Sequence, residues 1–445
     1  MLYKKKNERQ IGFYSTFEEQ LKRQHPLYIL ANKIDWQVFE KAFGKLYSPE
    51  GRPAKPIRLM VSLLMLKHIR NLSDESVVEQ WMENVYYQYF SGETSYACGF
   101  PCEASELVHF RNRIGEAGIE LIFKESIRIN NKDGRVDEGI VDTTVQEKNI
   151  TFPTDDKLHR KIIKKCVAIA EEQGIELRQS YRCTIEKLAK DQRFRRHPKN
   201  FRKARKADRR IKTIAGRLVR EMDRKLPANL YQTELTLFKR VLAQKRNDSN
   251  KIYSLHEPHV NCISKGKEHK KYEFGSKVSI ITTKRSGVII GALNIPKNDY
   301  DAHTVDPAFE QQQRLTGITL KRAFMDRGYR GISQVRGTKI EIPKTFNKSI
   351  NAYQQQQLKG GFRRRAAIEP KIGHLKEDHR LGRNYYKGIK GDNINVMLAA
   401  AGMNFKRMMN IFKKMFLAFL FYLLKSPFEI IRLEERSILI PKLAF

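Results

Sequence analysis

The sequence has no apolar run of the length that a membrane-spanning helix requires, which is roughly 18 to 20 residues. Its most apolar stretch, residues 415–424, is ten residues long and lies between Lys414 and Lys425. The N-terminal residues are basic, but no apolar segment of the kind found in signal peptides follows them. We therefore expect neither secretion nor a membrane partner, and we interpret residues 415–424 as a buried or partner-facing helix.

Cysteine is also scarce. The five cysteines are an odd number scattered along a long chain, which fits a reducing cytoplasm better than a disulfide framework. Cys98 and Cys102 have a CxxxC spacing, but no second Cys/His pair lies nearby at the spacing of a zinc finger. A zinc site is therefore not expected.

Acidic residues are few relative to basic ones. The chain has 49 Asp and Glu against 85 Lys and Arg, which leaves a formal net charge of +36. This charge exceeds what solubility requires and would attract a polyanion over the whole surface. Nucleic acid is therefore the first partner to consider. A protein that binds a membrane surface would also be basic, but it should carry a charged amphipathic helix or a spanning segment.

What the sequence does have begins with a helical region over residues 25–130. Apolar residues at helical spacing follow Pro56, and we expect this helix to end at Leu72. Ser73 is then a good N-cap for a second helix, because acidic residues occupy its first turn.

A third helix is predicted from an N-cap at Ser105, and it carries Arg111 and Arg113. Helix, turn and basic helix is the outline of a DNA-reading module, so we predict DNA contacts for these two arginines. The alternative is that the basic face is simply a solvated surface.

Strand-like patterns begin at residue 137. Residues 140–145 are apolar and β-branched except for Asp142, and a charge there is unusual unless it has a function. A second predicted strand, residues 320–325, ends at Asp326. Further strands are predicted over residues 251–255, 271–282, 288–295 and 340–343, and helical spacing resumes at about residue 358. Strands that carry acids, followed by a helix, indicate an α/β core whose carboxylates converge.

A basic helical insertion separates these strands. Residues 157–250 hold 28 Lys and Arg against 10 Asp and Glu, a net charge of +18 and half that of the whole chain. A block of one sign repels itself unless an anion lies against it. We therefore predict phosphate contacts for Arg202, Lys203, Arg205 and Lys206; the alternative is a solubilising or mobile arm.

The C-terminal part contains a predicted helix over residues 362–376. At about 100° per residue, Arg365, Glu369 and Lys376 fall on one face, so a carboxylate stands between two cations. A solvent-exposed stripe of salt bridges would look the same. Pro370 complicates this helix, because it either kinks it or makes Glu369 its cap.

These residues carry a family resemblance. Asp142 lies in IVDTT, Asp326 in FMDRGYRG and Glu369 in FRRRAAIEPKIGHLK, and these segments resemble the catalytic core of DDE transposases from bacterial insertion sequences. The family's Tyr-x2-Arg-x3-Glu-x6-Lys signature is matched by Arg365, Glu369 and Lys376. Its first position is Phe362 here, which keeps an aromatic ring and removes a hydroxyl that could bond phosphate.

The resemblance implies an α/β fold of the RNase H-like type, a mixed sheet flanked by helices, with an all-helical N-terminal domain and the basic helical insertion. It implies that Asp142, Asp326 and Glu369 are catalytic and bind two Mg²⁺ ions, with Mn²⁺ as a substitute. Arg365 and Lys376 would then position the DNA phosphates. The rival interpretation is a set of buried salt bridges, in which a cation rather than another acid faces each carboxylate.

The expected organisation is a DNA-binding domain over residues 1–130, a catalytic domain over 131–410 that contains the insertion, and an apolar tail over 411–445. The implied activity is cleavage at the ends of an insertion sequence and transfer of the 3′-hydroxyl strand into target DNA. The partners would be terminal inverted repeats and target DNA, and the protein would act as a homodimer or higher oligomer in the bacterial cytoplasm. Two other functions stay open: an RNase H-like nuclease, and a non-catalytic DNA-binding protein derived from a transposase.

Overall fold

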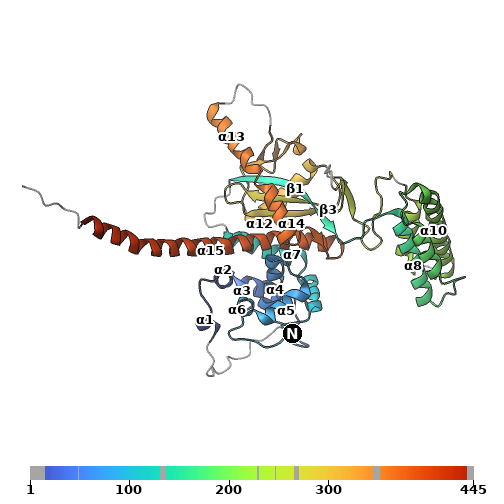
Figure 1. Cartoon of the computed structure of the whole chain (residues 1–445), viewed down its shortest axis with the longest axis horizontal. Helices are drawn as coiled ribbons and strands as arrows, with labels where there is room; N and C mark the ends of the chain where they lie inside the picture. Colours follow the sequence, from blue (N-terminus) through green and yellow to red (C-terminus); the bar gives the residue numbers. More distant parts are fainter. Residues whose placement is uncertain are drawn as a thin grey trace, which may run out of the picture.

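The computed structural model describes residues 16–48, 50–130, 137–227, 230–245, 247–264, 270–343 and 351–437, with side chains described as far as residue 415. The sheet, the helices around it, the N-terminal helices and the insertion are all visible in Figure 1. Within the described residues, none of the helices is both long and apolar enough to cross a membrane.

The centre of the molecule is a mixed sheet of eight strands among the described residues. Its order is β2-β3-β1-β5-β7-β6, with β4 paired to β3 and β8 paired to β1. β1 is antiparallel to β3 and parallel to β5, and β5 is parallel to β7. The strands are β1 (Glu138–Lys148), β2 (Asn261–Ser264), β3 (Tyr272–Thr283), β4 (Ile289–Ile295), β5 (Arg322–Phe324), β6 (Gln334–Val335), β7 (Thr338–Glu341) and β8 (Arg383–Asn384).

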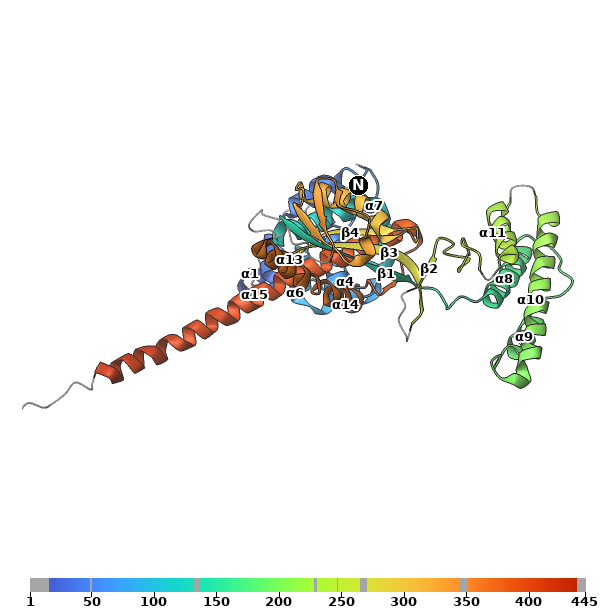
Figure 2. The same ribbon diagram turned by 90° about the horizontal axis from the view of Figure 1, so that it is seen from above.

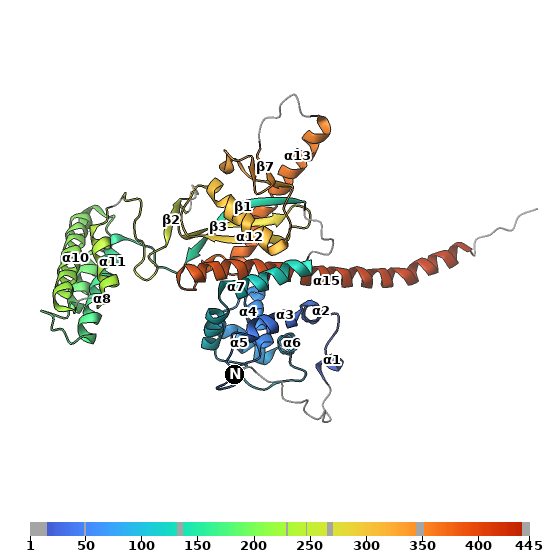
Figure 3. The same ribbon diagram turned by 180° about the vertical axis from the view of Figure 1, so that it is seen from behind.

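Helices cover both faces of this sheet. The helix α12 (Val305–Thr316) and the helix α14 (Ile368–Asp378) lie on opposite faces, as the front and back views show (Figures 1 and 3). The helix α13 (Ala352–Arg365) precedes α14, and the short 3-10 turns η1 (Asp301–Thr304) and η2 (Arg327–Tyr329) lie beside the strand ends. A mixed sheet flanked by helices is the architecture expected for the RNase H-like fold.

The long helix α15 (Gly388–Ser437) covers the edge of the sheet next to β4. The side chain of Asn404 accepts a hydrogen bond from the backbone N–H of Ile289 at 3.0 Å and donates one to its carbonyl at 2.8 Å. Asn404 thus replaces the missing neighbouring strand at this edge. The helix continues without interruption past residue 411, so the predicted tail begins inside α15 rather than at a boundary.

The N-terminal helices lie on the other side of α15 (Figure 3). They are α1 (Phe17–Gln20), α2 (Pro26–Lys33), α3 (Trp36–Gly44), α4 (Ile57–Arg70), α5 (Asp74–Glu83), α6 (Val85–Phe90) and α7 (Ala104–Asn130). Their buried apolar side chains form one continuous core with those of the sheet and α15. The N-terminal region and the sheet therefore pack as one unit.

The predicted helix ends in this region are partly correct. The Ser73 hydroxyl accepts a hydrogen bond from the Ser76 N–H at 3.0 Å, which confirms the predicted N-cap. α4 ends at Arg70, earlier than the predicted Leu72. Its C-cap Asn71 adopts a left-handed conformation with φ of 58°, which asparagine tolerates better than leucine. The predicted cap at Ser105 is wrong, since Ser105 lies inside the first turn of α7.

The insertion has a hydrophobic core of its own. It consists of α8 (Asp155–Glu172), α9 (Arg182–Asp191), α10 (Pro198–Lys225) and α11 (Gln232–Ala243), and it stands apart at one end of the sheet (Figure 2). Residues 251–255 have no strand structure, so the predicted strand there is wrong. Ile252 and Leu255 are apolar because they pack into the core of the insertion. This core shows why the segment between β1 and β2 folds as a separate helical body.

Candidate active site

Asp142 lies in the middle of β1. Its strand neighbours Ile140, Val141 and Val145 are buried, and Asp142 itself is paired with Ile280 of β3 in the antiparallel register. The Asp142 carboxylate is 17% exposed, and its Oδ1 accepts a hydrogen bond from the Thr143 N–H at 2.8 Å. The apolar residues on either side fix the strand, and the strand holds this carboxylate at an accessible position of the sheet.

Asp326 follows the neighbouring strand β5. The parallel register pairs Ile140 of β1 with Phe324 of β5. Since side chains alternate with a period of two, the residues two positions further on, Asp142 and Asp326, come to the same level and the same face. The Asp326 carboxylate also accepts a hydrogen bond from the Gly328 N–H at 2.8 Å and so starts the turn η2. The register thus places Asp142, in the middle of β1, level with Asp326, just after the end of the adjacent strand β5.

Glu369 reaches this region through Arg365. A guanidinium nitrogen of Arg365 lies 3.6 Å from the Asp142 carboxylate, and another lies 4.0 Å from that of Glu369. The Glu369 side chain is 69% exposed. The alternative interpretation of these acids as members of salt bridges is therefore correct in part, because a cation stands between Asp142 and Glu369.

The helix predicted over residues 362–376 is in fact two helices. α13 ends at Arg365, α14 begins at Ile368, and the break lies at Ala366 and Ala367. Neither alternative for Pro370 is correct: the break comes earlier, and Glu369 lies in the first turn rather than at the cap. Pro370 also lies in that first turn, where its missing N–H has no helical partner to lose. Arg365 and Glu369 nevertheless remain neighbours across the break.

A close contact between α13 and β5 sets the position of Arg365. A Cβ atom on Gly361 would lie 2.0 Å from the ring of Phe324, so only glycine lets the helix approach the strand this closely. Phe362 then packs edge-on against Phe324, with ring centroids 5.5 Å apart. The aromatic ring at the first signature position therefore anchors α13 to the strand that leads to Asp326.

A fourth carboxylate, which the sequence analysis missed, also lies at this site. Asp301 in η1 accepts hydrogen bonds from Thr143 Oγ1 at 3.2 Å and from Lys277 Nζ at 2.9 Å. A Cβ atom on Gly328 would lie 2.9 Å from Oδ1 of Asp326 and 3.5 Å from Oδ2 of Asp301, so the two carboxylates flank the same glycine. In the sequence, Asp301 resembles an ordinary acid just before a helix.

The pKa of the buried Tyr329 reflects the negative charge of these acids. It is 1% exposed, and its hydroxyl makes no well-formed hydrogen bond with the residues that the structure describes. Burial raises the pKa of Tyr329 well above its ordinary value, and the negative charges of Asp142, Asp301 and Asp326 raise it further. Three carboxylates therefore direct a negative potential at one buried point.

Carboxylate oxygens are the ligands that Mg²⁺ prefers, so the chemistry of this donor set suits a divalent cation. Across the described ranges, however, no three acid, His or Cys side chains are grouped as a metal site. Asp142 and Asp326 carry two of the carboxylates, and Arg365 stands between Asp142 and Glu369. Convergence of all three acids on shared ions stays a prediction.

Lys376 is turned toward the sheet. Its Nζ lies 3.7 Å from Oε1 of Glu273, a buried residue of β3. The predicted contact of Lys376 with a DNA phosphate would require it to leave this acid. Arg365 and Lys376 are thus both held by acids in this structure, and the phosphate contacts of both stay predictions.

The two arginines of the N-terminal region have different surroundings. Arg111 is 6% exposed, and its two terminal nitrogens donate to the Asp74 carboxylate at 2.7 and 2.9 Å while the guanidinium covers the ring of Tyr386. This burial contradicts the predicted DNA contact of Arg111, which instead ties α7 to α5. Arg113 is exposed and stacks on Tyr47, so its DNA contact stays a prediction.

The basic residues of the insertion lie on α10. Arg202, Lys203, Arg205 and Lys206 are all exposed, because the buried face of the helix is formed by Ala204, Ala207 and the apolar residues after them. Lys203 pairs with Asp191 at 2.9 Å, and Arg205 stacks on Phe201. The four side chains are therefore available to a phosphate backbone, as predicted contacts.

Two family models match the chain. The model described as "Transposase domain (DUF772)" matches residues 15–113, and the one described as "Transposase DDE domain" matches residues 254–405. The second match includes Asp326, Asp301 and Glu369, whereas Asp142 and the insertion precede it.

A curated relative from Rhizobium meliloti, "Uncharacterized protein ORF8 in nfe locus", is 42% identical over 177 residues. The aligned part covers 39% of this chain and 86% of the relative. No solved structure matches the chain.

Proposed function

The chain belongs to the DDE transposases of bacterial insertion sequences, and we propose that it cleaves the ends of its element and joins the freed 3′-hydroxyl to target DNA. The observation that supports this most strongly is the parallel register of β1 and β5, from which we infer that Asp142 and Asp326 lie close together. Arg365 connects this pair to Glu369, so the three signature acids belong to one region of the surface.

We further propose that Asp142, Asp326 and Glu369 supply the oxygen ligands for two Mg²⁺ ions, with Mn²⁺ as a substitute. When bound, such ions activate the attacking oxygen and stabilise charge on the leaving oxygen during displacement at phosphorus. Asp301 holds the Thr143 hydroxyl and Lys277 in place next to this donor set. Its role is to position these groups and to keep the local potential negative.

Arg365 has two roles in this proposal. Without DNA, its guanidinium neutralises Asp142 and Glu369, which would otherwise repel each other. With DNA present, the guanidinium turns to the phosphate next to the cleaved bond, where its planar fork of donors matches phosphate oxygens. Lys376, on the next helix α14, supplies a second cation once it separates from Glu273.

DNA would be held mainly outside this site. The exposed basic face of α10 contacts backbone phosphates and contributes affinity without sequence preference. The N-terminal helices, with Arg113 exposed on α7, contact the terminal repeats. Two or more copies would bring both ends of the element together, and the reaction would take place in the bacterial cytoplasm.

The test uses the full-length protein with linear DNA that carries the inverted repeats flanking its gene. Mg²⁺ and a supercoiled plasmid complete the reaction, and products are sized on denaturing and native gels. The proposal predicts nicks at the repeat ends and repeat DNA joined to the plasmid. Cleavage without joining would identify a nuclease, and binding without cleavage would identify a DNA-binding protein derived from a transposase.

A further inference from the structure

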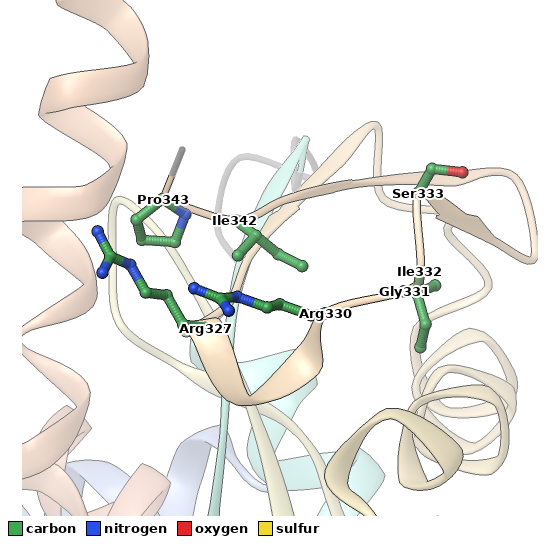
Figure 4. A pocket seen from close by; sticks show the side chains of 7 residues that line it. All are labelled: Arg327, Arg330, Gly331, Ile332, Ser333, Ile342 and Pro343. Carbon is green, nitrogen blue, oxygen red and sulfur yellow. The ribbon is translucent and has the colours of Figure 1, made fainter. Parts of the chain in front are cut away.

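A cavity of about 630 Å³ lies next to the turn η2, which follows Asp326 in the chain. Arg327, Arg330 and Gly331 line one side, and Ile332, Ser333, Ile342 and Pro343 line the rest (Figure 4). This volume falls within the usual range of small-molecule and nucleotide sites, which is roughly 300 to 1,000 Å³. The cavity is separate from the contact of Arg365 with Asp142, because it lies between η2 and the segment that follows β7.

The fold explains why a cavity forms here. β5 and β7 are parallel neighbours, and Phe324 is paired with Glu341 in their register. The chain turns away after each strand, into η2 at Asp326 and into Ile342 and Pro343 after β7. The carboxyl ends of adjacent parallel strands are where open α/β sheets bind their ligands.

Two arginines give the cavity its charge. Arg327 and Arg330 are both exposed, and neither forms a salt bridge with an acid in the described ranges. Arg336, a few residues further along, is by contrast paired with Asp306 at 2.9 Å and Glu310 at 2.8 Å. Figure 4 shows the side chains of Arg327 and Arg330 directed to the same side of the cavity. Two guanidinium groups on one wall repel each other unless an anion lies between them.

The cavity also has an apolar part. Ile342, which is 7% exposed, and Pro343 lie close to the two arginine side chains (Figure 4) and offer a surface without charge. A site with a cationic side and an apolar side fits a nucleotide, whose phosphate is charged and whose sugar and base are largely apolar on their faces. A free inorganic anion would use only the arginines.

We propose that this cavity binds one nucleotide of the DNA strand that flanks the cleaved bond, with its phosphate on Arg327 and Arg330. This inference rests on the proposed function, and it assigns the cavity to a phosphate close to the cleaved bond. Because Arg327 follows Asp326 directly, a phosphate held there fixes where the strand crosses the carboxylates. The two arginines are thus binding residues that set the position of the strand.

The experiment measures binding to terminal-repeat duplexes in which a single phosphate at or near the cleavage position is replaced by a neutral methylphosphonate. Binding is measured by fluorescence anisotropy without divalent metal, so it does not depend on cleavage. For the wild-type protein, one or two neutral linkages should weaken binding about tenfold, the effect of one lost charge-assisted contact. Arg327→Gln and Arg330→Gln should each weaken binding to unmodified DNA by a similar factor. In these variants, the neutral linkages that weaken binding of the wild type should cause no further loss of affinity.

Arg327→Lys and Arg330→Lys keep the charge and should retain most of the affinity. Lys414→Gln is the matched control, because it removes one exposed charge from α15, which does not line the cavity, and should leave the linkage pattern unchanged. If the Gln variants still respond to every neutral linkage as the wild type does, the cavity does not hold a DNA phosphate. The wild-type measurement tests the proposal even if the variants fail to fold. If no neutral linkage near the cleavage position weakens binding of the wild type, the proposal is wrong.

The outcome is distinct from that of the proposed function. A normal linkage pattern in a protein that never cleaves with Mg²⁺ would leave the cavity assignment standing and remove the transposition chemistry. Normal cleavage by a protein that shows no sensitivity to the neutral linkages would support the transposition chemistry and remove the cavity assignment.

Discussion

The guanidinium of Arg365 lies 3.6 Å from the carboxylate of Asp142 and 4.0 Å from that of Glu369. A cation thus stands where the proposed function requires divalent metal between acids. At an effective dielectric constant near 20, two unit charges about 4 Å apart interact by several kcal/mol, and solvent reduces this for side chains that are partly exposed. Arg365 should therefore compete with a metal ion for Asp142.

Arg365→Gln is expected to raise the affinity of the DNA-free protein for Mn²⁺ by about tenfold, which corresponds to roughly 1.4 kcal/mol. Isothermal titration calorimetry checks this directly. Arg364→Gln, an exposed neighbour on α13, is the matched control and should leave Mn²⁺ affinity unchanged. Equal affinity in the Arg365 variant and the wild type would show that the guanidinium does not occupy the metal's place.

The contrast between Arg111 and Arg113 gives a prediction on stability. Arg111→Gln leaves the Asp74 carboxylate, which is 13% exposed, with Lys67 as its remaining cation. We expect the free energy of unfolding to fall by about 2 to 4 kcal/mol, in the range for breaking a buried ion pair. Arg113→Gln should change it by less than about 0.5 kcal/mol, because the residue is exposed. Urea denaturation distinguishes them, and equal losses would contradict the structural role of Arg111.

The basic face of α10 gives a prediction on salt dependence. Replacement of Arg202, Lys203, Arg205 and Lys206 by Gln should weaken binding to repeat and unrelated DNA alike. The slope of log K against log salt should become shallower by up to about one unit per lost contact. As a control, each arginine among the four is changed to lysine and each lysine to arginine, which keeps the charge. A slope that does not change would place α10 away from the DNA.

A pair of buried histidines predicts how stability depends on pH. His379 donates a hydrogen bond from Nδ1 to the His68 carbonyl at 2.8 Å, and burial lowers the pKa of His379 to about 4. The pKa of His68 is also lowered, mainly by burial. Because the folded pKa lies below the unfolded value of 6.5, the unfolded chain binds more protons as the pH falls. Stability should therefore be fully present above pH 6.5 and decline from there toward pH 4.

For His379 alone this loss amounts to roughly 3 kcal/mol across that window. His379→Gln should lower stability at neutral pH but flatten its decline in acid. His374→Gln, at an exposed residue of α14, the helix that ends just before His379, should keep the decline of the wild type. Urea denaturation at several pH values measures both, and a His379 variant with an unchanged decline would refute this explanation.

Much of the fold could be predicted because local patterns and the final packing agree. The β-branched run around Asp142 forms β1, and Ser73 caps α5 as the sequence indicates. Residues 251–255 could not be predicted, because their apolar side chains serve the core of the insertion rather than the sheet. An apolar run does not indicate which of two cores it joins.

The candidate site was predictable only in part for a similar reason. Asp142 and Asp326 stand out because an acid within or directly after an apolar strand is unusual. Asp301 does not stand out, since its importance depends on contacts with Thr143 and Lys277. Arg111 was assigned to DNA because its burial depends on Asp74 and on a distant tyrosine that local spacing cannot reveal.

The most direct test of the central claim is the rate of Mg²⁺-dependent cleavage of terminal-repeat DNA by Asp142→Asn. Asparagine keeps the shape of the side chain and removes the charge that would hold the metal. DNA affinity and stability should stay close to those of the wild type, as they should in Asp137→Asn, a control at an exposed acid just before β1. We predict that single-turnover cleavage falls by at least about a thousandfold in Asp142→Asn, a loss of several kcal/mol of transition-state stabilisation, and stays normal in the control. Cleavage by Asp142→Asn at the wild-type rate would contradict the account.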